Sequence, residues 1–181
     1  MDATRTRVPQ VSQLQLRFDA LEDRLFLRMN TQDGQEFRFW LTRRFVRLLW
    51  PVLTRLIESR AEAQTQHIES LDAKKAVASF RHQEALAQTQ ANAPYQEGRE
   101  LPLGESPVLL SRIAVKPGEN QTPLLSLHPE QGPGIDLAMG DTLLNAFSKL
   151  LSDTLKSTEW DLNFALGFME GEEARKHVRL N

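Results

Sequence analysis

The chain has no cysteine among its 181 residues. This excludes disulfide bonds, thiolate zinc sites and a cysteine nucleophile. Long hydrophobic runs are missing too: the first ten residues, MDATRTRVPQ, are polar, and no stretch reaches the roughly 18 apolar residues that a membrane-spanning helix needs. We therefore expect no membrane association, and a cytoplasmic location is the default.

Catalytic and cofactor motifs are missing as well. The four histidines lie 15, 46 and 49 residues apart, at His67, His82, His128 and His177. None of these pairs has the close spacing of zinc ligands. The turn at 132–134 lacks the Lys-Ser or Lys-Thr of a phosphate-binding loop, and no serine stands in a GxSxG context. We therefore expect no metal, no cofactor and a protein that is not an enzyme; an enzyme of unrecognised type is the lesser alternative.

Lysine is absent from the first 60 residues, which nevertheless hold eleven arginines and only seven acidic residues. Because the whole chain has a formal net charge of −2, the remainder is acidic. Arginine binds phosphate and carboxylate groups with a planar fork and stacks on aromatic rings, which lysine does less well. The N-terminal third is therefore the best place to look for a binding surface.

Three alternating runs near the N-terminus have the period of half-buried strands. They cover residues 13–19, 24–29 and 37–41, and follow a loose arm at 1–11. The junction at 30–34 ends in Asp-Gly, which favours a tight turn. The pattern predicts a meander of three antiparallel strands.

A helix should follow the third strand directly. Thr42 is a good N-cap, and apolar residues then recur at helical spacing from Phe45 to Leu56. Pro51 removes one backbone donor, so we expect a kink near Arg47 or a break at the proline. Residues 60–92 are polar and helix-rich, which predicts one long helix with a narrow apolar stripe.

The same plan recurs after a Pro/Gly-rich linker at 93–106. Strands are expected at 108–116, 124–128 and 135–139, and Asp141 should cap a helix that contains Phe147. The helix positions match those of the first helix at a constant offset of 99. We therefore predict an internal duplication.

The predicted fold is α+β, with two pseudo-repeated antiparallel β-meander-plus-helix modules of three or four strands each (βββα or ββββα). A long connecting helix joins them, and the alternating run at 161–168 is a C-terminal strand. The expected division is a flexible arm at 1–11, a first module at 12–92, the linker at 93–106, a second module with the C-terminal strand at 107–169, and a polar tail at 170–181. A single continuous antiparallel sheet with helices on one side is the alternative. The thin helix stripe and the unassigned strand predict a homodimer.

One group of residues points to binding. If the apolar positions of the first meander face the helices, the opposite face carries cations interleaved with rings, at Arg17, Phe26, Arg28, Arg38 and Trp40. Such surfaces bind single-stranded DNA or RNA, because bases stack on the rings while guanidinium groups contact phosphates. In the other interpretation a partner chain or the long helix covers this face, and the arginines pair with Glu36, Glu22 or Asp23.

Residues 12–158 contain the order of strands followed by a helix twice. In this layout they resemble the repeats of the Whirly and Pur families of single-stranded DNA-binding proteins. The resemblance rests on topology, with three strands per repeat where those families have four. It implies single-stranded nucleic-acid binding. The sequence thus leaves two functions open: a binding module for single-stranded nucleic acid, or a protein-interaction or assembly factor whose sheet face is covered by a partner.

Overall fold

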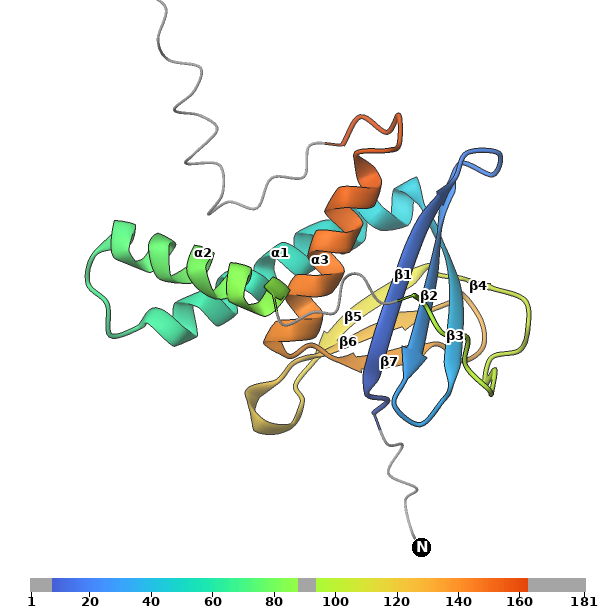
Figure 1. Ribbon diagram of the computed structural model, residues 1–181, viewed down its shortest axis with the longest axis horizontal. Helices are drawn as coiled ribbons and strands as arrows, with labels where there is room; N and C mark the ends of the chain where they lie inside the picture. Colours follow the sequence, from blue (N-terminus) through green and yellow to red (C-terminus); the bar gives the residue numbers. More distant parts are fainter. Residues whose placement is uncertain (1–7, 88–93, 163–181) are drawn as a thin grey trace, which may run out of the picture.

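The computed structural model describes residues 8–87 and 94–162 and has an α+β fold with a four-stranded and a three-stranded sheet (Figure 1). The elements follow in the order β1 (Val11–Asp19), β2 (Arg24–Thr31), β3 (Glu36–Thr42), α1 (Arg43–Thr65), α2 (Leu71–Ala87), β4 (Val108–Leu109), β5 (Arg112–Lys116), the 3₁₀ turn η1 (Glu119–Gln121), β6 (Leu124–His128), β7 (Ile135–Ala138) and α3 (Asp141–Leu155).

The first sheet has the strand order β1-β2-β3-β4. Its first three strands form the predicted antiparallel meander, while β4 pairs with β3 in the parallel direction. Gly34 has a φ of +85° in the turn between β2 and β3, a backbone conformation that favours glycine. The side chains that alternate toward the helices are buried on β2 and β3 and at Leu16, while Leu14 and Phe18 of β1 are partly buried, as the period of two predicts.

Helix α1 begins as predicted, because the Thr42 hydroxyl accepts a hydrogen bond from the Phe45 amide at 3.2 Å. Of the two outcomes predicted for Pro51, a kink or a break, the break is wrong, since α1 continues through the proline to Thr65. Pro51 cannot donate to the carbonyl of Arg47, but both residues are exposed. Water can therefore bond that carbonyl, which makes the proline tolerable.

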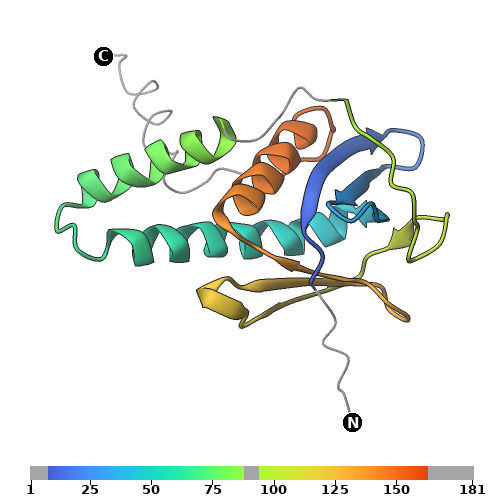
Figure 2. The same cartoon turned by 60° about the horizontal axis from the view of Figure 1, so that its bottom comes forward.

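The predicted long helix at 60–92 is also wrong. Helix α1 ends at Thr65, and α2 folds back beside α1 and α3 after a short connection (Figure 2). The turn is stabilised locally: the Ile68 amide donates to the Thr65 carbonyl at 2.9 Å, and Ser70 accepts from the Ala73 amide at 3.4 Å. Ser70 thus acts as an N-cap for a second helix, which competes with continuation of the first.

The predicted strand at 108–116 is divided between the sheets. Residues 108–109 form β4 of the first sheet, Leu110 is buried, and β5 begins the second sheet, whose order is β5-β6-β7. The predicted cap Asp141 is the first residue of α3, and the N-cap is Gly140. Of the predicted strand at 161–168, Asp161 and Leu162 are described and are not in a strand; the rest lies outside the described residues.

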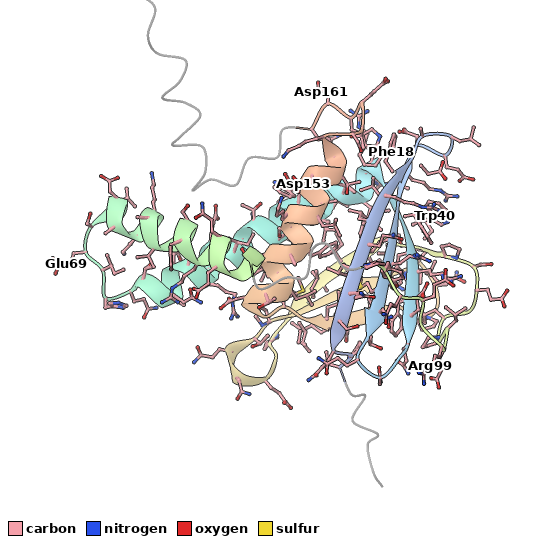
Figure 3. The ribbon with its side chains drawn as sticks, viewed as in Figure 1. Phe18, Trp40, Glu69, Arg99, Asp153 and Asp161 are labelled. Carbon is pink, nitrogen blue, oxygen red and sulfur yellow. The ribbon has the colours of Figure 1, made fainter. Side chains whose placement is uncertain are left out.

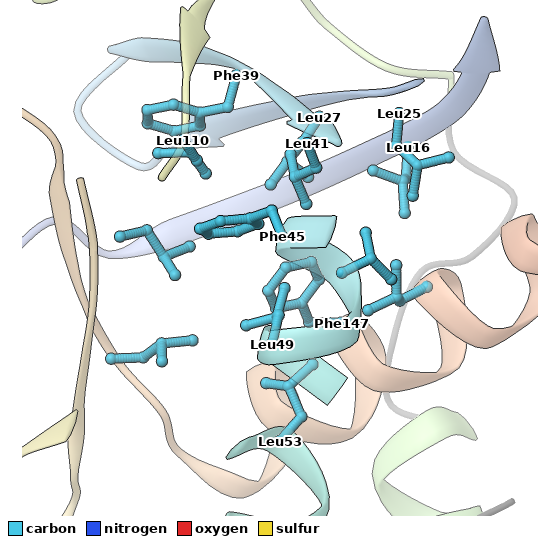
Figure 4. Packing of buried hydrophobic residues seen from close by; sticks show 14 of the residues in the cluster. Leu16, Leu25, Leu27, Phe39, Leu41, Phe45, Leu49, Leu53, Leu110 and Phe147 are labelled. Carbon is cyan, nitrogen blue, oxygen red and sulfur yellow. The ribbon is translucent and has the colours of Figure 1, made fainter. Parts of the chain in front are cut away.

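One hydrophobic cluster joins the inward faces of both sheets to α1 and α3 (Figure 4). Leu16, Leu27 and Phe39 contribute from the first sheet, and Leu127 contributes from the second. Phe147 of α3 is fully buried among them. The alternative of one continuous sheet is therefore wrong, because two sheets share the core.

Within the described ranges, no helix has the length and apolar character required to cross a bilayer.

Candidate interaction surface

The outer face of the first sheet, opposite α1 and α3, carries one row of side chains that runs across all four strands. Arg17 lies opposite Phe26, Phe26 lies opposite Trp40, and Trp40 lies opposite Leu109. We call these four residues the aromatic row. Neighbouring strands are about 4.8 Å apart, so the row spans about 14 Å. Trp40 is labelled on this side in Figure 3.

The rings of the aromatic row are stacked on each other and on arginines. The centroids of Phe26 and Trp40 are 5.0 Å apart at an interplanar angle of 44°. The guanidinium of Arg17 lies 4.9 Å from the Phe26 centroid, and that of Arg24 lies 4.2 Å from the Trp40 centroid. Phe26 is therefore only 9% exposed. Arg17 and Leu109 at the two ends of the row are exposed.

Arg28 and Arg38 lie opposite each other on β2 and β3, next to the aromatic row. Both are close to the carboxylate of Glu36, whose side chain is fully buried: the Arg38 Nε donates to it at 2.7 Å, and the Arg28 Nη1 lies 3.8 Å away. The hydrogen bond to Glu36 raises the pKa of Arg38, so its guanidinium stays charged. These cations are thus paired inside the protein.

The segment at 94–106, predicted as a linker, crosses this part of the outer face; we call it the strap (Figure 2). It is bonded to β1, β2 and β3 in turn. The Gln96 amide donates to Gln13 Oε1 at 2.9 Å, Asn30 Nδ2 donates to the Gln96 carbonyl at 2.7 Å, and the Gly98 amide donates to Glu36 Oε2 at 2.7 Å. The strap then continues along the edge of β3 toward β4.

Two strap side chains cover Arg28. Its Nη1 donates to Glu97 at 3.1 Å, and its guanidinium lies 4.3 Å from the centroid of the Tyr95 ring. Burial, together with the nearby charge of Glu36, raises the pKa of Tyr95 to about 12, so the phenol stays neutral. The half of the outer face that contains Arg28 and Arg38 is therefore covered and neutralised by the chain itself.

Gly98 allows the strap to approach the sheet. A Cβ atom at this position would lie 2.5 Å from the Cβ of Glu36 and 2.8 Å from its backbone nitrogen. Neither atom is the end of a flexible side chain, so a larger residue would push the strap away from β3. The close contact that aligns the Gly98 amide with Glu36 thus requires glycine.

The five residues proposed from the sequence do lie on one face, but they fall into two groups. Arg17, Phe26 and Trp40 belong to the aromatic row, whereas Arg28 and Arg38 lie under the strap. Of the carboxylates expected to pair with arginines, Glu36 does so, and Glu22 pairs with Arg24. The third, Asp23, accepts instead from the Trp160 indole at 2.6 Å.

The sequence interpretation missed the strap. It expected the long helix or a partner to cover the outer face, and it treated 93–106 as a connection. The segment does contain a signal: Tyr95, the only tyrosine of the chain, stands next to a short Gln-Glu-Gly stretch. This mixture of a ring, a charge and a glycine is as compatible with a packed segment as with a linker.

Two other parts of the molecule bring polar side chains together. A cavity of about 580 Å³ lies between α1, α2 and α3, but the carboxylate of Asp141 at its rim is already bonded to Arg60 and Gln64. On the second sheet, Asp136 accepts hydrogen bonds from Lys116 and His128. No group of three or more His, Cys, Asp or Glu residues suited to a metal ion is found in ranges 8–87 and 94–162.

Comparison with known proteins adds no family to this description. The chain matches no protein-family model, no curated protein and no solved structure.

Proposed function

We propose that this chain is a non-enzymatic interaction protein that binds a protein partner through the aromatic row. The observation that carries the proposal is the stacked arrangement of Arg17, Phe26, Trp40 and Arg24 beside the exposed Leu109. Trp and Arg are the residue types most enriched at the centres of protein interfaces. In the aromatic row the rotamers of the rings and arginines are held by mutual stacking, so binding costs little additional side-chain entropy.

A protein partner fits this surface better than single-stranded DNA or RNA. Base stacking needs a free ring face, but guanidinium groups already lie over both Phe26 and Trp40. Phosphate contacts need unpaired cations, whereas Arg28 and Arg38 are paired with Glu36 under the strap. Nucleic-acid binding is therefore the second hypothesis, restricted to Arg17 at the uncovered part of the face, because Arg24 is paired with Glu22.

A photo-crosslinking amino acid placed at Leu109 tests the protein-partner hypothesis in cells. We expect a discrete cross-linked protein that is absent when the same group replaces Leu48, an equally apolar side chain that is 53% exposed on α1. The cross-linked partner is then purified and titrated. Trp40→Ala should weaken binding of this partner by about 30-fold or more. This corresponds to the loss of about 2 kcal/mol of binding free energy that is typical of a central interface residue. Leu48→Ala should leave the affinity unchanged.

Titration of mixed-sequence single-stranded oligonucleotides at two salt concentrations tests the second hypothesis. Under our proposal the oligonucleotides bind weakly or not at all, and Trp40→Ala makes no difference. Affinity that falls steeply with salt and is lost in both Arg17→Ala and Trp40→Ala would instead assign the row to nucleic acid. Urea unfolding of each variant shows whether the sheet remains intact.

Self-association and internal duplication remain part of the proposal. Leu71 and Phe80 are each 66% exposed on α2, which favours a homodimer contact there. Light scattering that gives only the monomer mass of 20.7 kDa at all concentrations would contradict it. Duplication is supported by the shared order of three antiparallel strands and a helix in β1–α1 and β5–α3; superposition of the two units in an experimental structure tests it.

A further inference from the structure

Strand β5 forms an edge of the second sheet and contains no buried residue. Its register places Ile113 opposite Leu127 and Val115 opposite Leu125, so both side chains belong to the apolar face of the sheet. Leu125 and Leu127 are fully buried, yet Val115 is 46% exposed. The apolar face of the second sheet therefore continues beyond the part that the described residues cover.

The backbone of β5 is also unpaired along one side. Its ladder bonds go to β6, and within the described part of the chain no turn, loop or other strand bonds to Ile113, Ala114, Val115 or Lys116 from the opposite side. The N–H and C=O groups on that side can pair with an added strand. An added strand would also cover Val115 with one of its own side chains.

The outward face of β5 is basic. Arg112 and Lys116 lie at its two ends, on the same side of the strand, with Ala114 between them. The Arg112 Nε donates to the Pro129 carbonyl at 2.9 Å, and Arg112 forms no ion pair with a described residue. Lys116 lies 3.3 Å from Asp136, which also accepts from His128.

We propose that the free edge of β5 binds an extended peptide segment of a partner protein by strand addition, with apolar side chains on one face and acidic side chains on the other. The apolar residues would cover Ile113 and Val115, and the acidic residues would lie opposite Arg112 and Lys116. Main-chain hydrogen bonds supply affinity in this mode of recognition, and the alternating side chains supply specificity.

Charge argues against a second copy of β5 as the occupant. Antiparallel pairing of two β5 strands about Ala114 would place Arg112 of one chain opposite Lys116 of the other, twice. Like charges directly opposite each other on neighbouring strands are destabilising. An acidic strand converts the same two positions into attractive pairs. This inference concerns a different sheet from the aromatic row and does not depend on the proposed function of that row.

Fluorescence anisotropy with three labelled peptides tests the proposal on the full chain. The first alternates valine and glutamate over seven residues, the second has the same composition with the valines and glutamates in separate blocks, and the third alternates valine and lysine. We expect the alternating acidic peptide to bind at least tenfold more tightly than the other two. Equal binding of the two acidic peptides would overturn strand addition, because charge alone would then account for the affinity.

Substitution of Arg112 provides the second arm. We expect Arg112→Glu to fold because the side chain is exposed, and urea unfolding checks this. The variant should bind the alternating acidic peptide at least about fivefold more weakly and the alternating basic peptide more tightly. The matched control, Arg44→Glu on the exposed side of α1, should change neither affinity. An equal effect of both substitutions would show non-specific attraction and overturn the proposal.

Two further measurements distinguish peptide binding at the β5 edge from binding at the aromatic row and from self-association. Trp40→Ala should not alter peptide binding, whereas a loss would place the peptide on the aromatic row instead. Light scattering of the wild type and of Val115→Lys tests self-pairing of β5, because Val115 is 46% exposed on the apolar face that a second copy would cover. A dimer that dissociates when Val115 is replaced would make a second copy the occupant and overturn the assignment to an acidic partner.

Discussion

At the scale of the residue, Glu36 organises the outer face of the first sheet. Its carboxylate is fully buried, and it accepts hydrogen bonds from the Arg38 guanidinium and the Gly98 amide. One buried anion therefore neutralises a cation of the sheet and anchors the strap. A buried charge is tolerated when its partners are close and its hydrogen bonds are made.

Glu36→Gln tests this role. The substitution keeps the volume but removes the charge, which leaves Arg28 and Arg38 without their buried partner. We expect the free energy of unfolding to fall by about 3 kcal/mol, the cost of breaking a buried pair. Glu97→Gln is the control: Glu97 also contacts Arg28 but its side chain is 70% exposed, so the change should be below about 1 kcal/mol. Urea unfolding of the two variants measures both, and equal effects would contradict a special role for the buried carboxylate.

At the scale of the element, Asp136 ties the three strands of the second sheet together. It stands on β7, accepts from His128 of β6 at 3.1 Å, and pairs with Lys116 of β5 at 3.3 Å. Burial by itself would raise the pKa of Asp136, but the hydrogen bonds from His128 and Lys116 and the positive charge of Lys116 help to outweigh burial and hold the pKa below its usual value.

The lowered pKa of Asp136 predicts a specific pH dependence of stability. A carboxyl group that ionises more readily in the folded state stabilises the protein above the pKa of the unfolded chain, about 4 for aspartate. That contribution begins to be lost as the pH falls below about 4, and the loss is complete once the pH is below the lowered pKa of the folded state. Asp136→Asn should therefore reduce stability at pH 7 and make the decline toward pH 3 shallower. Glu130→Gln, at an exposed loop position, should leave the profile unchanged; a parallel shift at all pH values would contradict the mechanism.

At the scale of the whole molecule, the two sheets share one core instead of each having its own. Helices α1 and α3 lie in contact, and the buried residues of both sheets pack with them into one cluster. Leu110, where the chain passes from the first sheet to the second, is itself buried in this cluster. Domains that share a core in this way are expected to unfold together.

Leu127→Ala in β6 tests this coupling. Leu127 is fully buried, so its truncation should cost about 2–5 kcal/mol. Because the core is shared, hydrogen exchange should show the same loss of protection for amides of β2 in the other sheet as for those of β6. Leu71→Ala, at a position 66% exposed on α2, serves as the control. Loss of protection confined to the second sheet would mean that the sheets unfold independently.

The sequence was informative where structure depends on neighbours along the chain. The alternation at 24–41, the Asp-Gly turn and the Thr42 cap are local patterns, and each formed as predicted. The α+β class and the position of the five candidate residues on one sheet face follow from those local patterns. Two of the errors were local as well: Ser70 was not recognised as a cap, and a break at Pro51 was allowed although the proline is exposed.

Only the tertiary structure decided what covers each face. Leu110 divides one apparent strand between two sheets, and the strap lies on strands β1 to β3, which precede it by more than 50 residues in the chain, as the Asn30–Gln96 hydrogen bond shows. Periodicity tells which side of a strand is apolar, because side chains alternate along it. It does not tell which distant segment will cover the polar side, because that depends on burial and hydrogen bonding between residues far apart in the chain.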